Sequence, residues 1–114
     1  MADKTLFQRI ADRELPADIL YEDDHCICIR DIDPKAPVHV LIIPRKPIPS
    51  IDELDASDAE LVGHLFLVAA NVASAEGLTD GYRAVFNCGE DGQQTVPHIH
   101  LHVLGGRKLT WPPG

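Results

Sequence analysis

The segment that decides the fold of this chain is residues 98–104, with the sequence HIHLHVL. Histidine alternates with Ile, Leu and Val. On an extended strand, successive side chains point to opposite faces, so alternate residues share one face. We therefore predict a strand on which His98, His100 and His102 stand in one row, while the aliphatic residues between them face the core. The two glycines that follow are expected to end this strand.

The row of histidines has three interpretations. Two of the rings can bind one metal ion with His39 as a third ligand, although the whole row spans about 13 Å and cannot reach a single ion. Alternatively, one imidazole attacks a substrate while its neighbours move protons, and His100 is then the best nucleophile because it has a histidine on each side. The third interpretation is that the rings are only hydrogen-bonded within the core.

Length and composition define the class of protein. The chain has 114 residues, 45% of them hydrophobic and 25% charged, which is typical of one globular domain spanning residues 1–114. The formal net charge of −8 disfavours binding to nucleic acid, which needs a basic face. No apolar run reaches the ~20 residues of a membrane helix, and the N-terminus lacks the pattern of a signal peptide. We therefore expect no membrane association and a cytoplasmic location.

The cysteines are three in number, Cys26, Cys28 and Cys88. Without a secretory signal, free thiols are the expected state. A zinc site built on Cys26 and Cys28 is disfavoured because the pair lacks the usual ligand spacing. His25 lies beside the turn formed by Asp23 and Asp24 and is interpreted as a solvated turn residue.

The order of elements predicts an α+β fold with a five-stranded antiparallel sheet and two helices. We expect a first helix over residues 5–15, ended by Pro16, and a second from the capping box of Ser57 and Glu60 to about residue 76. On the second helix, His64 is interpreted as structural, and the inward face is expected to consist of Leu61, Leu65, Val68, Val72 and Ala75. The predicted strands are residues 19–22, 26–32, 38–44, 82–87 and 98–104.

Several residues near the histidine row suit a nucleotide. Gln93, Gln94 and Thr95 precede the row and can donate hydrogen bonds to phosphoryl oxygens, and Asn87 can join them. Asp31 suits a pair of ribose hydroxyls, because an ionised carboxylate only accepts hydrogen bonds. The remaining candidates share an apolar side chain that can sandwich a flat base; they are Phe7, Ile10, Ile29 and Ile32.

Residues 98–104 resemble the signature of the histidine triad (HIT) superfamily of nucleotide hydrolases and transferases. The resemblance covers essentially the whole chain and is strongest to the histidine triad nucleotide-binding (Hint) branch, to which the ending Trp-Pro-Pro-Gly at residues 111–114 is quite specific. Further matching segments are residues 21–24, 31–32, 36–39, 43–44, 81–83, 87, 91–92, 94 and 104–107.

The resemblance implies a purine nucleoside phosphoramidase, which hydrolyses the P–N bond of AMP or GMP phosphoramidates without a metal or other cofactor. It implies that His100 forms a nucleotidyl-histidine intermediate and that His39 and His98 orient it. It also implies a phosphate-binding set of His102, Asn87, Gln94 and Thr95, a ribose ligand in Asp31, and a base pocket formed by Phe7, Ile10, Ile29 and Ile32.

The resemblance also implies a homodimer in which two five-stranded sheets join into a ten-stranded sheet. The tail, residues 107–114, is expected to dock near the partner's active site, with Trp111 as its apolar anchor. Three residues depart from the family pattern: Thr95 replaces a serine usual in animal members, Gln93 replaces a glycine, and Pro97 precedes the triad. The alternatives are dinucleoside polyphosphate hydrolysis, nucleotidyl transfer, or a non-catalytic role in nucleotide binding or protein interaction.

Overall fold

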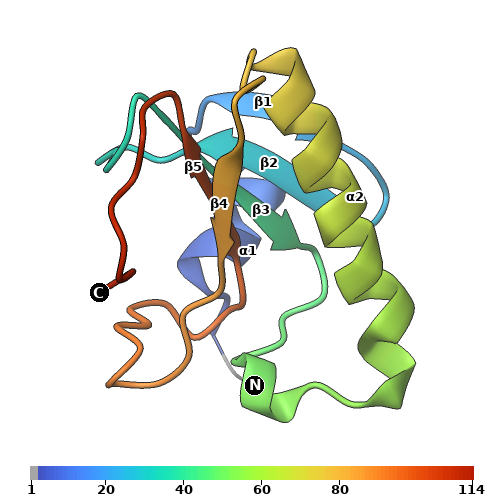
Figure 1. Ribbon diagram of the computed structural model, residues 1–114. Coiled ribbons are helices and arrows are strands. Elements are labelled where there is room, and N and C mark those ends of the chain that lie inside the picture. The colour runs from blue at the N-terminus through green and yellow to red at the C-terminus, as the bar shows by residue number, and fades with distance from the viewer. Residues whose placement is uncertain (1–2) are drawn as a thin grey trace.

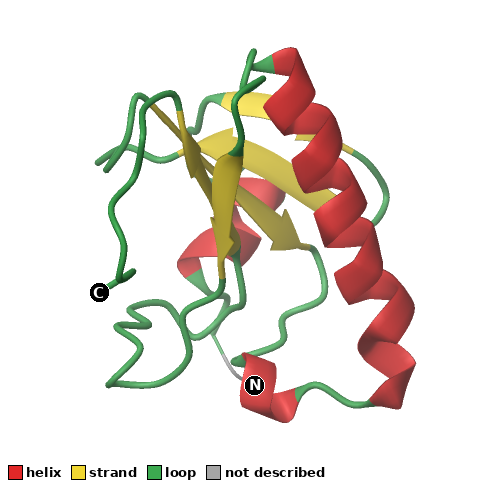
Figure 2. Cartoon of the chain, viewed as in Figure 1, coloured by secondary structure: helices red, strands yellow, loops and turns green. Residues whose placement is uncertain are grey.

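A computed structural model describes residues 3–114 and contains one antiparallel sheet with a helix on each face (Figures 1 and 2). The strand order is β1-β2-β3-β5-β4. The strands are β1 (Ile19–Glu22), β2 (Cys26–Arg30), β3 (Val38–Pro44), β4 (Tyr82–Val85) and β5 (Leu101–Gly105). The helices are α1 (Leu6–Ala11), α2 (Ala59–Ala75) and the short 3-10 turns η1 (Ile51–Glu53) and η2 (Ala56–Asp58). The predicted fold class is therefore confirmed.

β3 lies at the centre of the sheet, as its run of aliphatic residues predicted. It pairs with β2 on one side and with β5 on the other, where Leu41 lies opposite His102. The pairing brings His39 of β3 beside the histidine strand, although more than fifty residues separate them in the sequence. No helix within residues 3–114 has both the length and the apolar character needed to span a membrane.

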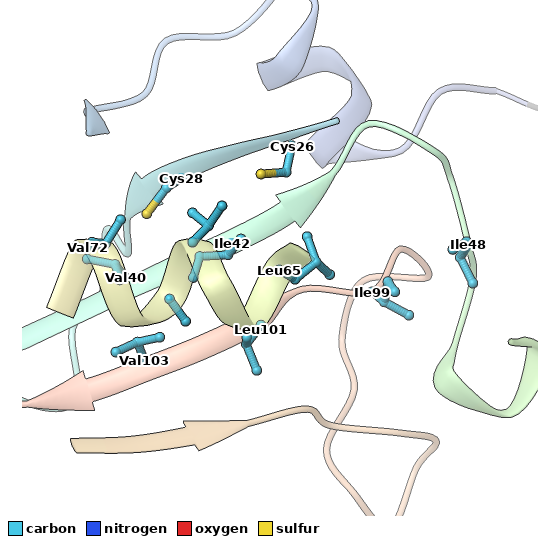
Figure 3. Packing of buried hydrophobic residues seen from close by; sticks show 12 residues of the cluster. Cys26, Cys28, Val40, Ile42, Ile48, Leu65, Val72, Ile99, Leu101 and Val103 are labelled. Carbon is cyan, nitrogen blue, oxygen red and sulfur yellow. The ribbon is translucent and has the colours of Figure 1, made fainter. Parts of the chain in front are cut away.

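Alternation along the strands produces two separate apolar clusters. On β2, Cys26 and Cys28 pack in the cluster under α2, whereas Ile27 and Ile29 pack in the cluster under α1. The cluster under α2 is shown in Figure 3, where the helix side chains interdigitate with those of β3 and β5. The two faces of one sheet therefore have two cores, and the histidine row belongs to the α1 side.

The histidine strand is shorter than predicted. β5 begins at Leu101, because the segment before it bonds to a loop and not to a strand: the Ile99 N–H donates to the Ile48 carbonyl at 2.8 Å. The alternation nevertheless continues through residues 98–100. Ile99 is buried in the cluster under α2, and the rings of His98 and His100 both contact Phe7 on the other face.

Helix α1 is also shorter than predicted, since it ends at Ala11 and not at Leu15. Thr5 caps it in a capping box with Gln8. The helix ends where the backbone of Arg13 adopts a φ of 64°, a left-handed conformation that a helix cannot continue. This early ending leaves part of the α1 face of the sheet uncovered.

Helix α2 is preceded by a different cap from the predicted one. Asp55 and Asp58 form the capping box, on η2, and the pair of Ser57 and Glu60 does not. Asp58 is held by Lys46 at 2.6 Å. The buried residues of α2 are Leu65, Val68, Ala69, Val72 and Ala73. Ala75 is exposed, contrary to prediction, whereas Gly77 follows the helix with the expected left-handed φ of 76°.

Two other strand boundaries were predicted too far along the chain. β2 ends at Arg30 and β4 ends at Val85, two residues before each predicted end. Asp31 still donates its N–H to the His39 carbonyl at 3.0 Å, so it keeps the position next to β3 that the longer strand would give it. Its side chain therefore faces the histidines.

Candidate functional site

A cleft of about 400 Å³ opens between α1 and the edge of the sheet face that carries the histidines. α1 supplies one wall, the end of β2 supplies another, and β5 forms the floor. Eight of the predicted site residues line this cleft: Phe7, Ile10, Ile29, Asp31, Ile32, Thr95, His100 and His102. Its lining is mostly apolar with a few polar side chains, which is the general character of a small-molecule site.

His100 is held with a free ring nitrogen. Its Nδ1 lies 2.8 Å from the carbonyl of His98, and a carbonyl only accepts, so Nδ1 carries the proton. In the neutral ring, Nε2 then has a lone pair and no proton. Burial lowers the pKa of His100, because desolvation disfavours the charged form. The Phe7 ring contacts the imidazole at 4.7 Å between centroids and restrains it from one side. His100 is therefore arranged as a nucleophile or base.

His102 is held in the opposite tautomer through His39. The backbone N–H of Lys35 donates to His39 Nδ1 at 3.0 Å, so His39 carries its proton on Nε2. This Nε2 donates to His102 Nδ1 at 2.9 Å, which places the proton of His102 on its own Nε2. Burial, together with the charges that His100 and His39 can carry, lowers the pKa of His102 to about 4. His102 is therefore a neutral hydrogen-bond donor beside an acceptor, the ring centroids being 4.9 Å apart.

His98 lies behind the site and not in it. It is fully buried, donates from Nε2 to the Pro44 carbonyl at 2.7 Å, and accepts at Nδ1 from the hydroxyl of Thr5 at 2.8 Å. Burial lowers the pKa of this ring and keeps it neutral. Since the His98 carbonyl holds His100, the Thr5 hydroxyl is connected to the nucleophile candidate through one residue. Nothing in the local sequence around Thr5 indicates this contact with a residue 93 positions away.

Asp31 lines the cleft next to His39. One carboxylate oxygen accepts from the Asp33 N–H at 2.8 Å, and the other lies 3.5 Å from His39 Nε2. Ile32 follows it at the rim with 99% of its side chain exposed, so its contact with any ligand is one-sided. Asp31, His39 and His102 each offer one donor atom, and these atoms lie within 4.8 Å of one another. A metal bound in this cleft would use this group, whereas the metal interpretation made from the sequence used two rings of the row with His39.

The loop before the triad places only one of its four candidate residues in the cleft. Thr95 lines it, but the Gln94 amide nitrogen donates to the carbonyls of Pro49 at 2.6 Å and Val96 at 3.0 Å. Asn87 donates to the Gly92 carbonyl at 2.6 Å, and Gln93 is exposed. The amides of Asn87 and Gln94 are therefore engaged by backbone carbonyls, and neither residue lines the cleft.

Gln93 and Gly92 explain the shape of this loop. Gln93 has a φ of 62°, the conformation that favours the glycine it replaces in the resemblance. A Cβ on Gly92 would lie 2.3 Å from the Cys88 carbonyl oxygen, so this position requires glycine. The loop thus keeps a compact turn in spite of the departure at residue 93.

Trp111 does not line the cleft of its own chain. Its side chain is 80% exposed, with the Arg83 guanidinium 5.9 Å from the ring centroid. Arg83 also donates to the Thr110 carbonyl at 2.9 Å and so holds the tail against β4. The tail therefore has a defined course but leaves its largest apolar side chain uncovered.

Comparison with known proteins agrees with this geometry. A family model described as the HIT domain matches residues 12–109. An uncharacterized HIT-like protein of Synechococcus elongatus is 54% identical over 114 residues, covering 100% of both chains. The crystal structure of a HIT family hydrolase from Legionella pneumophila is similar at a TM-score of 0.95 and 49% identity, covering 97% of this chain and 100% of that one. A HIT family hydrolase from Clostridium thermocellum has a TM-score of 0.92 and 42% identity, with 96% of each chain covered.

Proposed function

Because the chain belongs to the HIT domain family, we propose that it is a purine nucleoside phosphoramidase that uses His100 Nε2 as its nucleophile. The similarity to two HIT family hydrolases supports hydrolysis in general. The observation that carries the finer proposal is the pair of opposite tautomers. One ring presents a lone pair and the next presents an N–H, on the floor of the same cleft.

The reaction follows from these two nitrogens. His100 Nε2 attacks the phosphorus of a nucleoside 5′-phosphoramidate, and the P–N bond breaks as the P–Nε2 bond forms. The amine leaves with a proton taken from solvent, and His102 Nε2–H stabilises the charge on a phosphoryl oxygen. Water then attacks phosphorus, displaces Nε2 and releases one proton and the nucleoside monophosphate. The restored neutral His100 is ready for the next cycle.

The remaining walls of the cleft fit the rest of a nucleotide. Phe7, Ile10 and Ile29 are buried apolar side chains that can enclose a purine, and Asp31 can accept from the ribose hydroxyls. Thr95 is the side chain of the triad loop available to donate to a phosphoryl oxygen. In this proposal, Asn87, Gln93 and Gln94 act by shaping the loop.

The test is turnover of an adenosine phosphoramidate by His100→Ala beside wild type. Loss of the nucleophile should reduce turnover at least a thousandfold while AMP affinity stays within about tenfold, since chemistry and binding are separate terms. The matched control is His25→Ala, which removes an exposed histidine that does not line the cleft and should leave turnover unchanged. Acid quench with labelled substrate should trap a phosphorus–nitrogen adduct on wild type and on His25→Ala only.

The same assay separates the alternatives. A dinucleoside polyphosphate and a sugar nucleotide are compared with the phosphoramidate, and the proposal expects the phosphoramidate to be turned over fastest. Treatment with a chelator should leave the rate unchanged, because neither ring needs a metal to hold its tautomer. Wild-type turnover by His100→Ala, or preference for another substrate, would contradict the proposed function.

The proposal includes a homodimer, supported by an exposed apolar surface at one edge of the sheet. Phe66 and Leu67 of α2 and Tyr82 of β4 are 46%, 66% and 42% exposed, and Phe66 contacts Phe86 just after β4. β4 is an edge strand, so a second copy can extend the sheet there to ten strands, with the tail of each copy near the cleft of the other. Light scattering should give twice the monomer mass for wild type and the monomer mass for Leu67→Glu.

A further inference from the structure

A second group of polar side chains lies outside the cleft, where the turn between β1 and β2 meets α2. Asp23, Cys26 and His64 each offer one donor atom, and these three atoms lie within 4.8 Å of one another. None of the three lines the nucleotide cleft. The sequence alone predicts a turn residue in Asp23, a free thiol in Cys26 and a structural histidine in His64, with nothing to connect them.

The Asp23 carboxylate is oriented by the backbone. Its Oδ1 accepts from the N–H groups of His25 at 2.7 Å and Cys26 at 2.8 Å. This leaves Oδ2 facing outward from the turn, where it meets His64 Nε2 at 2.6 Å and the hydroxyl of Tyr21 at 2.8 Å. The turn therefore fixes one oxygen and presents the other, which is how backbone contacts commonly support a metal-binding carboxylate.

An open cavity of about 380 Å³ adjoins the group. It is lined by His25, Ser57, Glu60, Leu61 and His64, so it reaches the imidazole from the solvent side. The His25 ring stands edge-on to the His64 ring with centroids 5.5 Å apart. An ion entering through this cavity would meet His64 first, with the buried Cys26 thiol on the inner side and His25 on the outer side.

We propose that Asp23, Cys26 and His64 form a zinc-binding site whose fourth position faces this cavity, where His25 or water completes a tetrahedron. Carboxylate, thiolate and imidazole are the three side-chain ligands that zinc uses in proteins. Bonds of 2.0–2.3 Å in a tetrahedron separate ligand atoms by roughly 3.3–3.7 Å, so the three atoms need only small side-chain adjustments.

The protons and charges of this site balance. Zinc replaces the thiol proton of Cys26, which leaves to solvent, and the ring proton of His64 passes from Nε2 to Nδ1. The bound group of one cation, one thiolate and one carboxylate is then neutral, whereas the free group carries the single charge of Asp23. A neutral bound state suits a site whose thiol is buried and whose cavity adds a further carboxylate, Glu60. The sequence disfavoured a zinc site that pairs Cys26 with Cys28, whereas the fold brings Cys26 together with Asp23 of the preceding turn and His64 of α2.

The chain offers a specific spectroscopic test, with cobalt(II) as the probe. Cobalt bound to a thiolate gives a near-ultraviolet charge-transfer band, and cobalt bound to histidine and carboxylate alone does not. The group in the nucleotide cleft, Asp31, His39 and His102, contains no cysteine and is silent in this measurement. Titrating metal-free full-length protein should give a band that saturates at one cobalt per chain and disappears when one equivalent of zinc is added.

Matched variants assign the band. Cys26→Ser should abolish it, whereas Cys88→Ser, which removes the only cysteine that is not buried, should keep it. His64→Asn changes a half-buried side chain and provides a second variant should Cys26→Ser fold poorly; it should weaken cobalt binding at least tenfold. Circular dichroism confirms that each variant is folded. Absence of the band in wild type, its survival in Cys26→Ser, a cobalt affinity of His64→Asn within tenfold of wild type, or loss of the band in Cys88→Ser would overturn the proposal.

Discussion

The two faces of the sheet are formed by the same strands, yet one is sealed and the other is open. α2 has 17 residues and covers its face with a cluster that contains only apolar side chains and two thiols. α1 has six residues and covers only part of the opposite face, which leaves the cleft and its histidines. The difference shows that the length of the covering helix, and not the strands themselves, determines where a ligand can enter.

The largest expected effects come from two separate substitutions at adjacent residues of β5, whose side chains lie on opposite faces of the sheet. Leu101 is fully buried on the α2 face, so Leu101→Ala should lower the free energy of unfolding by about 2–5 kcal/mol through lost transfer energy and a cavity. Turnover per folded molecule should change little. His102→Gln, one residue later, should do the reverse, with a loss of turnover of about a hundredfold or more and a small change in stability. Urea unfolding and phosphoramidate turnover, measured on both variants, check this.

That comparison has a clear opposing outcome. If Leu101→Ala reduced the turnover of folded protein as strongly as His102→Gln does, the two faces would not be independent. The apolar core would then be part of the positioning of the histidines, and the separation of the two clusters would have no functional meaning.

Most of the fold could be predicted from the sequence because its determining signals are local. Alternation of residues along a strand is visible in the sequence, and it placed Ile99, Leu101 and Val103 in the core, as the structure confirms. The predicted boundaries were wrong where a distant hydrogen-bond partner or a local backbone conformation, and not the periodicity, decided them. β5 starts late because the Ile99 N–H finds the Ile48 carbonyl, and α1 stops early because Arg13 turns left-handed.

Part of the site could also be predicted, because some of its residues carry local sequence signals. The residues of the cleft share simple signals, such as a histidine row or a carboxylate at a strand end. The tautomers of His39 and His100 depend on the Lys35 N–H and the His98 carbonyl, and no pattern of side chains in the sequence reveals these backbone contacts. Gln94 is the opposite case. Its amide suits a phosphate in the sequence, but the fold uses it to tie the loop to Pro49.

The pH dependence of the free energy of unfolding should also distinguish the two faces of the sheet. We expect this effect to be smaller than that of the two β5 substitutions. Burial lowers the pKa of His39, His98, His100 and His102, the last to about 4. Between the unfolded value near 6.5 and about 4, the unfolded chain binds more protons than the folded one, so stability falls as pH is lowered through this window. Each histidine adds a slope of at most about 1.4 kcal/mol per pH unit.

Urea unfolding at a series of pH values measures this slope. The free energy of unfolding of His102→Gln should decrease less steeply with falling pH than that of wild type, since one histidine with a lowered pKa has been removed. The stability of Leu101→Ala should decrease with pH as steeply as that of wild type, at a lower overall value, because Leu101 packs among apolar side chains and thiols. Equal slopes for wild type and His102→Gln would show that the folded protein accepts the proton on that ring without cost.

The smallest expected effect concerns the one hydroxyl that connects α1 to the histidine row. Thr5 Oγ1 donates to His98 Nδ1 and accepts from the Gln8 N–H, so Thr5→Val keeps the shape of the side chain and removes both bonds. One lost hydrogen bond is worth about 1 kcal/mol, which corresponds to a fall in kcat of up to about tenfold with KM nearly unchanged, because the base pocket is intact. Thr5→Ser keeps the hydroxyl and should restore kcat. If KM rose in Thr5→Val while kcat stayed constant, the hydroxyl would serve only to hold α1 in place as the wall of the cleft. The hydrogen bond from Thr5 to His98 would then have no effect on the positioning of His100.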